Sequence, residues 1–550
     1  MGKDDRDPGG PQGRPLPSPG LAYAAERLAR TAFPKLTITP PAPGIRFERD
    51  VAVPMRDGVR LRVNVFRPDR AGRFPIIMSA HPYGKDVLPQ RTPFGYLPLK
   101  RYRFIRQPDP ITHSAYTSWE APDPSFWVPR GYAVVNVDLR GFGTSEGVGA
   151  LFSDQEAADY AEVIEWAARE RWSNGRVGLN GVSYLAISQW KVAALRPPPL
   201  VAICPWEGWS DVYHDVAYPG GVREDGFIDF WASMTERAGQ VSESLRAGQL
   251  AHPQWDDFWA ARTPALERIE VPALICGSFS DQSLHTRGSF EAFRRIRSTH
   301  RFLYTHRGGK WSTYYSPDAL ALQARFFDCF LKGEDNGMRD LAPVRVEIRS
   351  RAHEVYAVRH EQAWPPPGVR WSALHLAPGE LRSAPLETPA TVRFAVPEGG
   401  ARFVFRAAEE MDLVGPMKLR LHLALEGLTD AHLFVAVSKI ANEPLRFEGP
   451  FGFGCDVVAR GWLRVAHRRV DDRDEPLPEG EIAPVDIEIL PSATHFARGD
   501  LLRLDVQGRW FWRRSMLFGM FPCGYAASPT GKVTLHLGGA YDSHLLVPQA

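Results

Sequence analysis

The chain has 550 residues, of which 66 are basic and 64 acidic, so its formal net charge at pH 7 is only +2. This balance excludes nucleic acid as an expected partner, because no strong positive field is present to attract a polyanion. The length exceeds the roughly 250 to 300 residues that one core organises, so two or three domains are expected. No segment approaches the roughly 20 consecutive apolar residues of a membrane helix, and we expect no membrane association.

The N-terminal residues and the cysteines indicate the cellular compartment. Residues 1–20 are polar and rich in proline and glycine, without the apolar stretch of a signal peptide. We expect a disordered tail and a short helix, near 22–31, over residues 1–40. Five cysteines, at positions 204, 276, 329, 455 and 523, form no CxxC pair, which favours a reduced, cytoplasmic setting and no metal site.

The first half of the chain predicts a parallel sheet covered by helices. Residues 47–54 and 61–66 alternate in polarity around the turn Arg56-Asp57-Gly58 and predict an antiparallel hairpin. The segments 74–79, 132–138 and 177–180 are short and apolar, as strands buried on both faces must be. Residues 156–171 have helical periodicity, so strand, helix and strand form a βαβ unit.

The alternation stops at residue 205 and resumes at 269. Residues 205–268 are rich in aromatics and predict an inserted helical cap. A strand at 271–276, a helix at 288–296, a strand at 301–305 and a helix at 317–331 complete the sheet domain, which we assign to 41–204 and 269–342. From 343 to 550 short alternating strands separated by Pro, Gly and Asp predict a β-sandwich or jelly roll, whose expected role is structural.

The strongest chemical signal is the sequence Gly181-Val182-Ser183. An apolar strand precedes it and a helix-forming stretch follows, which is the context of a nucleophile elbow. Leu185 occupies the place of the second glycine in the pattern G-x-S-x-G, so the bare motif is only half matched. We nevertheless predict Ser183 to be the nucleophile of a serine hydrolase with an α/β-hydrolase sheet.

A serine nucleophile needs an imidazole as base and a carboxylate to orient that imidazole. Asp281 follows the strand 271–276 and is the predicted acid, with a helix N-cap as its structural alternative. His306 follows the strand 301–305 and is the predicted base. His285 is the second candidate, although its place four residues after Asp281 argues against a position between Asp281 and Ser183.

The oxyanion of the tetrahedral intermediate needs two hydrogen-bond donors. The backbone N–H of Tyr184 is one expected donor. The loop 80–86 after the strand 74–79 should supply the other, and the hydroxyl of Tyr83 is the candidate there. A tyrosine that only packs in a proline turn is the alternative.

Five blocks together resemble the family of cocaine esterase and X-Pro dipeptidyl peptidases, the peptidase S15-like α/β-hydrolases. They are MRDGVRLRVNVFRP at 55–68, HPYGKD at 81–86, DLRGFGTSEG at 138–147, IEWAARERWSNGRVGLNGVSYLA at 164–186 and FFDCFLKG at 326–333. HLGGAYDSHLLVP near the C-terminus resembles the end of the family's jelly roll. The resemblance implies a hydrolase core, a cap and a C-terminal jelly roll of galactose-binding-like type. It also implies Ser183 as nucleophile, Asp281 as acid, and the Tyr83 hydroxyl with the Tyr184 amide as oxyanion hole.

Two positions depart from the family pattern. Ala186 replaces a glycine three residues after the serine, a change that a helix accepts. The family's histidine lies in a G-P-W-x-H block, whereas this chain reads THRGGKWSTYY, with Trp311 retained and Thr313 at the histidine position. His306 can therefore act as base only if the loop is rebuilt.

Three functions remain open from the sequence. The first is an acyl hydrolase that cleaves small-molecule carboxylic esters or amides, with an apolar pocket formed by cap aromatics: Trp206, Trp209, Tyr213, Tyr218, Phe227, Phe230 and Trp231. The second is an X-Pro dipeptidyl peptidase, which needs a carboxylate for the substrate amine, and the candidates are Glu207, Asp211, Asp215, Glu224 and Asp225. The third is a hydrolase fold that binds a ligand or partner without catalysis.

The sequence also bears on cofactors, on access to the site and on oligomeric state. No HExxH motif and no glycine-rich phosphate loop are present, so we expect neither a metal nor a nucleotide cofactor. The proline-rich segment 87–127 is expected to cover the site as a lid, and deletion of part of it should alter substrate preference more than stability. The sequence leaves open whether the chain forms a homo-oligomer.

Overall fold

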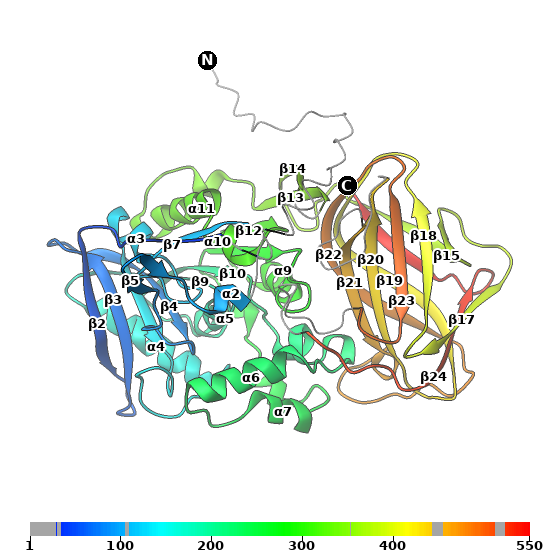
Figure 1. The fold of residues 1–550 in the computed structure, drawn as a ribbon, viewed down its shortest axis with the longest axis horizontal. Helices are drawn as coiled ribbons and strands as arrows, with labels where there is room; N and C mark the ends of the chain where they lie inside the picture. Colours follow the sequence, from blue (N-terminus) through cyan, green and yellow to red (C-terminus); the bar gives the residue numbers. More distant parts are fainter. Residues whose placement is uncertain are drawn as a thin grey trace, which may run out of the picture.

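The computed structural model describes residues 29, 33, 35–104, 109–351, 354–442, 455–511 and 523–550, with only the backbone described at 103 and 104. The predicted tail and, apart from residue 29, the helix predicted near 22–31 lie outside the described residues. Figure 1 shows two bodies side by side, a sheet covered by helices and a domain built mostly of strands.

The first body is organised by one mixed sheet. In order across the sheet, its strands are β2 (Ile45–Pro54), β3 (Arg60–Pro68), β8 (Ala133–Asp138), β4 (Phe74–His81), β9 (Ser173–Val182), β10 (Leu200–Trp206), β11 (Ala273–Ser278), β12 (Arg301–His306) and β13 (Val344–Arg351). β2, β3 and β8 pair antiparallel, whereas β8, β4 and every later strand pair parallel. The predicted hairpin and the predicted parallel sheet are confirmed.

The central strands form because their residues are apolar on both faces. Every residue of β4 and β8 is buried, including Ile76, Ile77, Val134 and Val135. A parallel strand inside a sheet has helices on both faces, which favours such mostly apolar runs, and the buried Ser79 and Asn136 satisfy each other by a hydrogen bond of 3.0 Å.

Helices connect the parallel strands. The main ones are α4 (Asp154–Arg169), α5 (Tyr184–Leu195), α9 (Thr286–Arg295) and α11 (Pro317–Phe327), and short ones are α2 (Arg101–Phe104), α3 (Pro124–Trp127) and α10 (Lys310–Tyr314). α4 begins where the hydroxyl of Ser153 accepts a hydrogen bond from the Glu156 N–H at 3.1 Å. α5 packs against β4, β9 and β10, which places its first residues at the carboxyl edge of the sheet.

Two insertions lie on this sheet domain. Between β10 and β11 the chain forms α6 (Phe227–Ala238), α7 (Leu245–Ala251) and α8 (Asp257–Ala260). α6 and α7 lie along the lower edge of the sheet domain in Figure 1. The segment 87–127 contains β5 (Gln90–Thr92), β6 (Gly95–Leu97) and β7 (Ile111–Ser114), and β7 pairs parallel with β1 (Leu36–Thr39).

The second body consists mostly of strands. These are β15 (Arg370–Ala377), β16 (Glu380–Arg382), β17 (Ala390–Val396), β18 (Gly400–Arg406), β19 (Met411–Glu426), β20 (His432–Ile440), β21 (Cys455–Arg464), β22 (Ala483–Phe496), β23 (Leu501–Gln507), β24 (Gly531–Leu537) and β25 (His544–Gln549). A separate apolar core fills it, with Leu419, Leu421 and Leu423 of β19 buried and their neighbours turned outward. The prediction of a strand-rich C-terminal domain is confirmed.

The strand pairings differ from an open sandwich. They close a ring in the order β19, β22, β21, β20, β23, β18, β16, β15, β25 and back to β19. The ring closes through two single-residue pairings, Gly461 with Ile489 and Glu380 with Val404, which join edges that a sandwich leaves apart. Nothing in a strand pattern marks such short contacts.

The boundary between the bodies also differs from the expectation at residue 343. β13 extends the parallel sheet beside β12, and β14 (Glu354–Glu361) pairs antiparallel with β13. β13 also reaches the second body, where Arg349 pairs with Thr494 of β22 and the Ser350 carbonyl accepts a hydrogen bond from Nζ of Lys439 at 2.6 Å. Within the described part of the chain, no helix combines the length and the apolar character needed to cross a membrane.

Candidate active site

Ser183 lies at a strained turn between β9 and α5. Its backbone has φ 59° and ψ −117°, a conformation that non-glycine residues rarely adopt. Gly181 has φ 155°, and a Cβ there would lie 2.4 Å from the Cβ of Leu185. Leu185 therefore fills the space that Gly181 leaves, which explains why the elbow forms without the second glycine of the motif.

His285 is the imidazole in contact with the serine. The Oγ of Ser183 and the Nε2 of His285 are 3.0 Å apart, within hydrogen-bonding distance. His285 precedes α9, and the N–H groups of Leu284, His285 and Thr286 all donate to the carbonyl of Asp281. This tight turn after β11 folds the side chain back toward Ser183.

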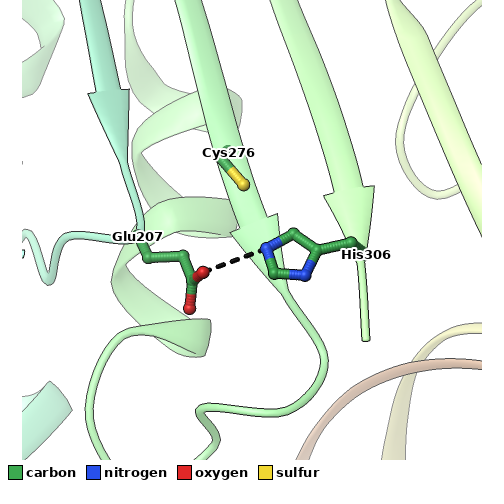
Figure 2. A group of neighbouring side chains, drawn as sticks. All are labelled: Glu207, Cys276 and His306. Atoms are coloured by element: carbon green, nitrogen blue, oxygen red, sulfur yellow. Dashed lines mark hydrogen bonds and ion pairs between the residues drawn. The ribbon is translucent and has the colours of Figure 1, made fainter. Parts of the chain in front are cut away.

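The prediction of His306 as the contact of Ser183 is therefore wrong in this structure. The Nε2 of His306 lies 3.0 Å from Oε1 of Glu207, and its Nδ1 lies 3.3 Å from the Oγ1 of Thr313 (Figure 2). Glu207 follows β10 directly and has φ 50°, and its carboxylate points past β11 toward His306 at the end of β12 (Figure 2). Both ring nitrogens of His306 are thus engaged away from the nucleophile.

Asp281 lies beside the imidazole of His285. A triad acid normally accepts a hydrogen bond from the ring nitrogen that faces away from the serine, and Asp281 does not. Its Oδ2 is 4.0 Å from the Nε2 of His285, the nitrogen that also faces Ser183. The Nδ1 of His285 is buried and has no hydrogen-bond partner among the described residues. Asp281 can therefore act on His285 through its charge, whereas the N–H···O bond of a standard relay is not formed.

Lys310, from α10, completes the charged group. Its Nζ lies 2.5 Å from Oδ2 of Asp281, which is the separation of an ion pair. Burial raises the pKa of Asp281 and the ammonium opposes this effect, and at this distance we treat Asp281 as a carboxylate. Burial lowers the pKa of His285 well below its usual value, and the charge of Lys310 lowers it further.

Glu120 supports the elbow from the segment 87–127. Its carbonyl accepts the N–H of Val182 at 3.1 Å, and its Oε1 accepts the indole N–H of Trp311 at 3.1 Å. Burial raises the pKa of Glu120 to about 7, against the opposing charge of Lys310. Part of this segment therefore holds the strand that carries the nucleophile. The contacts could not be read from a proline-rich composition.

The structure shows the surroundings of the two predicted oxyanion donors, Tyr184 and Tyr83. Tyr184 is the first residue of α5, so its backbone N–H belongs to the first helical turn, whose donors have no partner within the helix. The Tyr83 hydroxyl accepts the indole N–H of Trp231 at 3.1 Å, and it donates no hydrogen bond to another described residue. Burial raises the pKa of Tyr83, which keeps the phenol protonated at neutral pH.

Aromatic rings lie beside His285 and Tyr184. Tyr184 stacks with Trp231 at a centroid distance of 5.8 Å, and Trp209 lies 5.3 Å from the ring of His285. Phe152, which the sequence did not single out, contacts Tyr184, Trp209 and Trp231. Two of the four rings, Trp209 and Trp231, come from the cap segment 205–268, and the other two come from the first residue of α5 and from the loop before α4.

The five carboxylates considered for an amine site already have partners. Glu207 bonds His306, Asp211 bonds His214, and Asp215 pairs with Arg287. Glu224 accepts backbone N–H groups of its own cap and of Gly524, and Asp225 pairs with arginines. Each is committed to the fold, so a substrate amine would have to displace a formed contact.

One buried group has the side chains of a possible metal site: Glu207, Cys276 and His306 (Figure 2). Their ligand atoms all lie within 4.8 Å of one another. Burial raises the pKa of the Cys276 thiol well above its usual value. A metal needs the thiolate, and the Glu207 to His306 hydrogen bond already satisfies the other two groups. The donor set therefore fits a buried polar pair better than a metal centre.

Comparisons with known proteins cover both bodies. Residues 57–251 match the family model described as X-Pro dipeptidyl-peptidase (S15 family), and residues 336–546 match that of the X-Pro dipeptidyl-peptidase C-terminal non-catalytic domain. The chain is 25% identical to a cocaine esterase of Rhodococcus sp. over 91% of this chain and 98% of that protein. It is 23% identical to a putative Xaa-Pro dipeptidyl-peptidase of Rhodopirellula baltica over 81% and 80%. A crystal structure of a CocE/NonD family hydrolase from Staphylococcus aureus has a TM-score of 0.84 and 35% identity, covering 94% of this chain and 100% of that one.

Proposed function

The chain belongs to the family of cocaine esterase and X-Pro dipeptidyl-peptidases, and from this premise we propose that it cleaves carboxylic ester bonds through an acyl-enzyme at Ser183. Its class, a serine hydrolase acting on ester or amide bonds, follows from the family. The observation that carries the choice of residues is the 3.0 Å contact between Ser183 Oγ and His285 Nε2.

The proposed reaction uses one imidazole in both half-reactions. The neutral His285 accepts the hydroxyl proton of Ser183 as the oxygen attacks the ester carbonyl, and it then gives that proton to the leaving alkoxide. A water molecule loses a proton to His285 as it attacks the acyl-enzyme, and the proton returns to Ser183 as the carboxylic acid leaves. The lowered pKa of His285 keeps it in the neutral, proton-accepting form.

Asp281 and the oxyanion donors have electrostatic roles in this proposal. Asp281 lies 4.0 Å from the nitrogen that becomes cationic, so its charge stabilises the imidazolium of the transition state. The Tyr184 N–H and the Tyr83 hydroxyl would donate to the oxyanion, and loss of one such donor generally costs about 3 kcal/mol of transition-state stabilisation.

We favour esters of apolar acyl groups over X-Pro peptides. The rings of Tyr184, Trp209 and Trp231 give the site an apolar wall. A dipeptidyl peptidase needs a carboxylate for the substrate's free amine, and the cap carboxylates are engaged in structural contacts. The family models keep the peptidase as the second candidate.

The test is hydrolysis of p-nitrophenyl esters of increasing acyl length beside an Xaa-Pro-p-nitroanilide. Ser183→Ala and His285→Ala should each lower kcat on esters by roughly 10³-fold or more. His306→Ala is the matched control, since it removes a buried imidazole that does not touch Ser183. Loss of activity in His306→Ala with retention in His285→Ala would overturn the choice of base.

The same panel decides between the candidate functions. A higher kcat/KM on the anilide than on every ester would replace the esterase by the peptidase. Inactivity of the wild type, together with no labelling of Ser183 by an active-site phosphonate, would favour a binding protein with a hydrolase fold.

We also propose that the ring of C-terminal strands is a flattened jelly roll. The alternation of buried and outward residues along β19 supports two packed faces, and a continuous core separates them. An experimental structure checks this topology, and a round barrel with a filled lumen would contradict it.

A further inference from the structure

The outer face of the C-terminal domain gathers four histidines from four strands. His375 of β15 is the direct partner of His544 of β25, and His422 of β19 is the direct partner of His536 of β24. Arg420, two residues before His422, is in turn opposite His544. Directly opposed residues share a face of a sheet, and so do residues i and i+2 of one strand. All four histidines therefore lie on one face.

That face points to solvent. The residues of opposite parity, Leu374, Leu419, Leu535 and Leu545, are buried in the core of the domain. The histidine side chains consequently lie on the outer face of the domain and are partly exposed.

Asp542 joins two of these histidines. Its Oδ1 lies 2.6 Å from the Nδ1 of His375, and its Oδ2 lies 3.2 Å from the Nδ1 of His544. The ligand atoms of the three residues all lie within 4.8 Å of one another. The Asp542 side chain is 50% exposed, against 13% for His375 and 21% for His544, so the imidazoles are held by the strands while the carboxylate opens to solvent.

We propose that His375, Asp542 and His544 bind one divalent transition-metal ion of the Zn²⁺, Ni²⁺ or Cu²⁺ type. Imidazole nitrogen with one carboxylate oxygen is a donor set that these ions prefer over Mg²⁺ or Ca²⁺. Bonds of about 2.0 to 2.2 Å to Zn²⁺ require ligand atoms a little over 3 Å apart, which the present contacts approach. Three protein ligands leave further coordination positions for water.

The charges around the three residues are compatible with this role. Arg420 is the register partner of His544, and both carboxylate oxygens of Asp486 hold its guanidinium, at 2.8 and 2.7 Å. Its guanidinium is therefore directed to Asp486. The Asp542 carboxylate keeps its hydrogen bond with His375, and the Nδ1 of His544 contacts both that carboxylate and the Asp542 backbone carbonyl, the latter at 3.0 Å. A bound ion would connect β15 to β25, the last strand of the chain, and so stabilise the C-terminal domain.

Binding of Zn²⁺ alone to the chelator-treated full chain tests the site. Isothermal titration should give one site per chain, and His375→Ala, His544→Ala and Asp542→Asn should each weaken it at least about tenfold, since loss even of an outer-shell partner costs that much. His360→Ala is the matched control, because His360 is an exposed strand histidine on β14, outside the cluster. It should leave the affinity unchanged.

A second measurement uses only the wild-type protein, so its result does not depend on whether the variants fold. One equivalent of Co²⁺ added to the wild type should produce the visible absorption of a protein-bound ion, and Zn²⁺ should displace it. Equal Zn²⁺ affinity in wild type and all three cluster variants, or no Co²⁺ spectrum at one equivalent, would overturn the proposal.

Discussion

Lys310 lies in the active site as the ion-pair partner of Asp281, and its charge also acts on Glu207 and Glu120. Burial alone lowers the pKa of Lys310, but the three carboxylates more than compensate, and the pKa is raised. The ammonium therefore stays charged, holds Asp281 in place and lowers the pKa of His285. We regard Lys310 as a positioning residue for the acid and base.

Lys310→Met should lower kcat/KM at least about tenfold and change the pH profile. The sign follows from the role of His285, which works only when deprotonated. Removal of the cation raises the pKa of His285, so the fall of activity on the acid side should move to higher pH. The measurement is kcat/KM for one p-nitrophenyl ester between pH 5 and 9.

Lys310→Arg is the control. It keeps the positive charge, so its activity should fall on the acid side at the same pH as that of the wild type. Unpairing a buried carboxylate can cost about 3 to 5 kcal/mol of stability, so each variant is compared at temperatures well below its Tm. An acid limb of Lys310→Met that coincides with that of the wild type would contradict the electrostatic role.

The residues of the site were predictable from sequence to different degrees. Ser183 and Asp281 follow apolar strands, a local pattern that any reader of the sequence can detect. The choice between His285 and His306 depends on the turn in which three N–H groups converge on the Asp281 carbonyl, and on Glu207 adopting φ 50°. Neither conformation has a sequence signature, because each is imposed by tertiary packing.

At the scale of elements, α9 sets the position of His285 because it packs directly on the loop that carries Trp209. Gly288 is the contact residue. A Cβ there would lie 2.3 Å from both the backbone nitrogen of Ser210 and Oδ2 of Asp215, and 2.6 Å from the Cα of Trp209. The helix and the loop therefore touch backbone to backbone.

Gly288→Ala should destabilise the protein by about 1–3 kcal/mol through overpacking. Alanine would by itself favour the helix by about 1 kcal/mol, so the sign of the change shows which effect prevails. The displaced α9 should also move His285, three residues upstream, and lower kcat more than KM. Urea unfolding and ester kinetics are the measurements.

Arg294→Ala is a suitable comparison on the same helix, because it removes only an exposed pair with Glu291. It should change stability by less than about 0.5 kcal/mol. If Gly288→Ala were as stable and as active as Arg294→Ala, the close packing of α9 would not control the base.

Among the elements, those with strong periodicity were predictable and those decided by distant contacts were not. The helix predicted at 156–171 is α4, and the strand predicted at 177–180 is β9. β13 has the alternating pattern of the C-terminal strands, yet its backbone pairs with β12 because that edge of the parallel sheet is open. A side-chain pattern specifies that a strand forms but does not specify its neighbour.

At the scale of the whole molecule, the C-terminal domain contributes to the geometry of the active site. Gln282, next to Asp281, donates to the carbonyl of Val458 at 2.8 Å, and Arg307 pairs with Asp456. The cap also rests on this domain, where Val222 packs with Phe434 and Trp462. The two bodies therefore hold the catalytic turn and the cap between them.

His214 is the titratable link in this interface. Its Nδ1 lies 2.7 Å from Asp211 of the cap region, and its Nε2 lies 2.5 Å from Asp471 of the C-terminal domain. Burial lowers the pKa of His214, but the two carboxylates outweigh this effect and raise it to about 9. The unfolded value is about 6.5. The pair of contacts should therefore stabilise the protein fully below pH 6.5 and lose that contribution as the pH rises through 9.

His214→Gln should accordingly lower the free energy of unfolding by about 1–2 kcal/mol at pH 6, a value reduced for the partial exposure of Asp471. The difference from the wild type should shrink with rising pH and vanish near pH 10, because the wild-type imidazole is then neutral. Urea unfolding at pH 6, 8 and 10 measures this, with His252→Gln as the control for an imidazole that contacts Asp256 within the cap alone. A difference that stays constant from pH 6 to 10 would mean that His214 stabilises the interface by packing, and that its charge between Asp211 and Asp471 has no part in holding the two domains together.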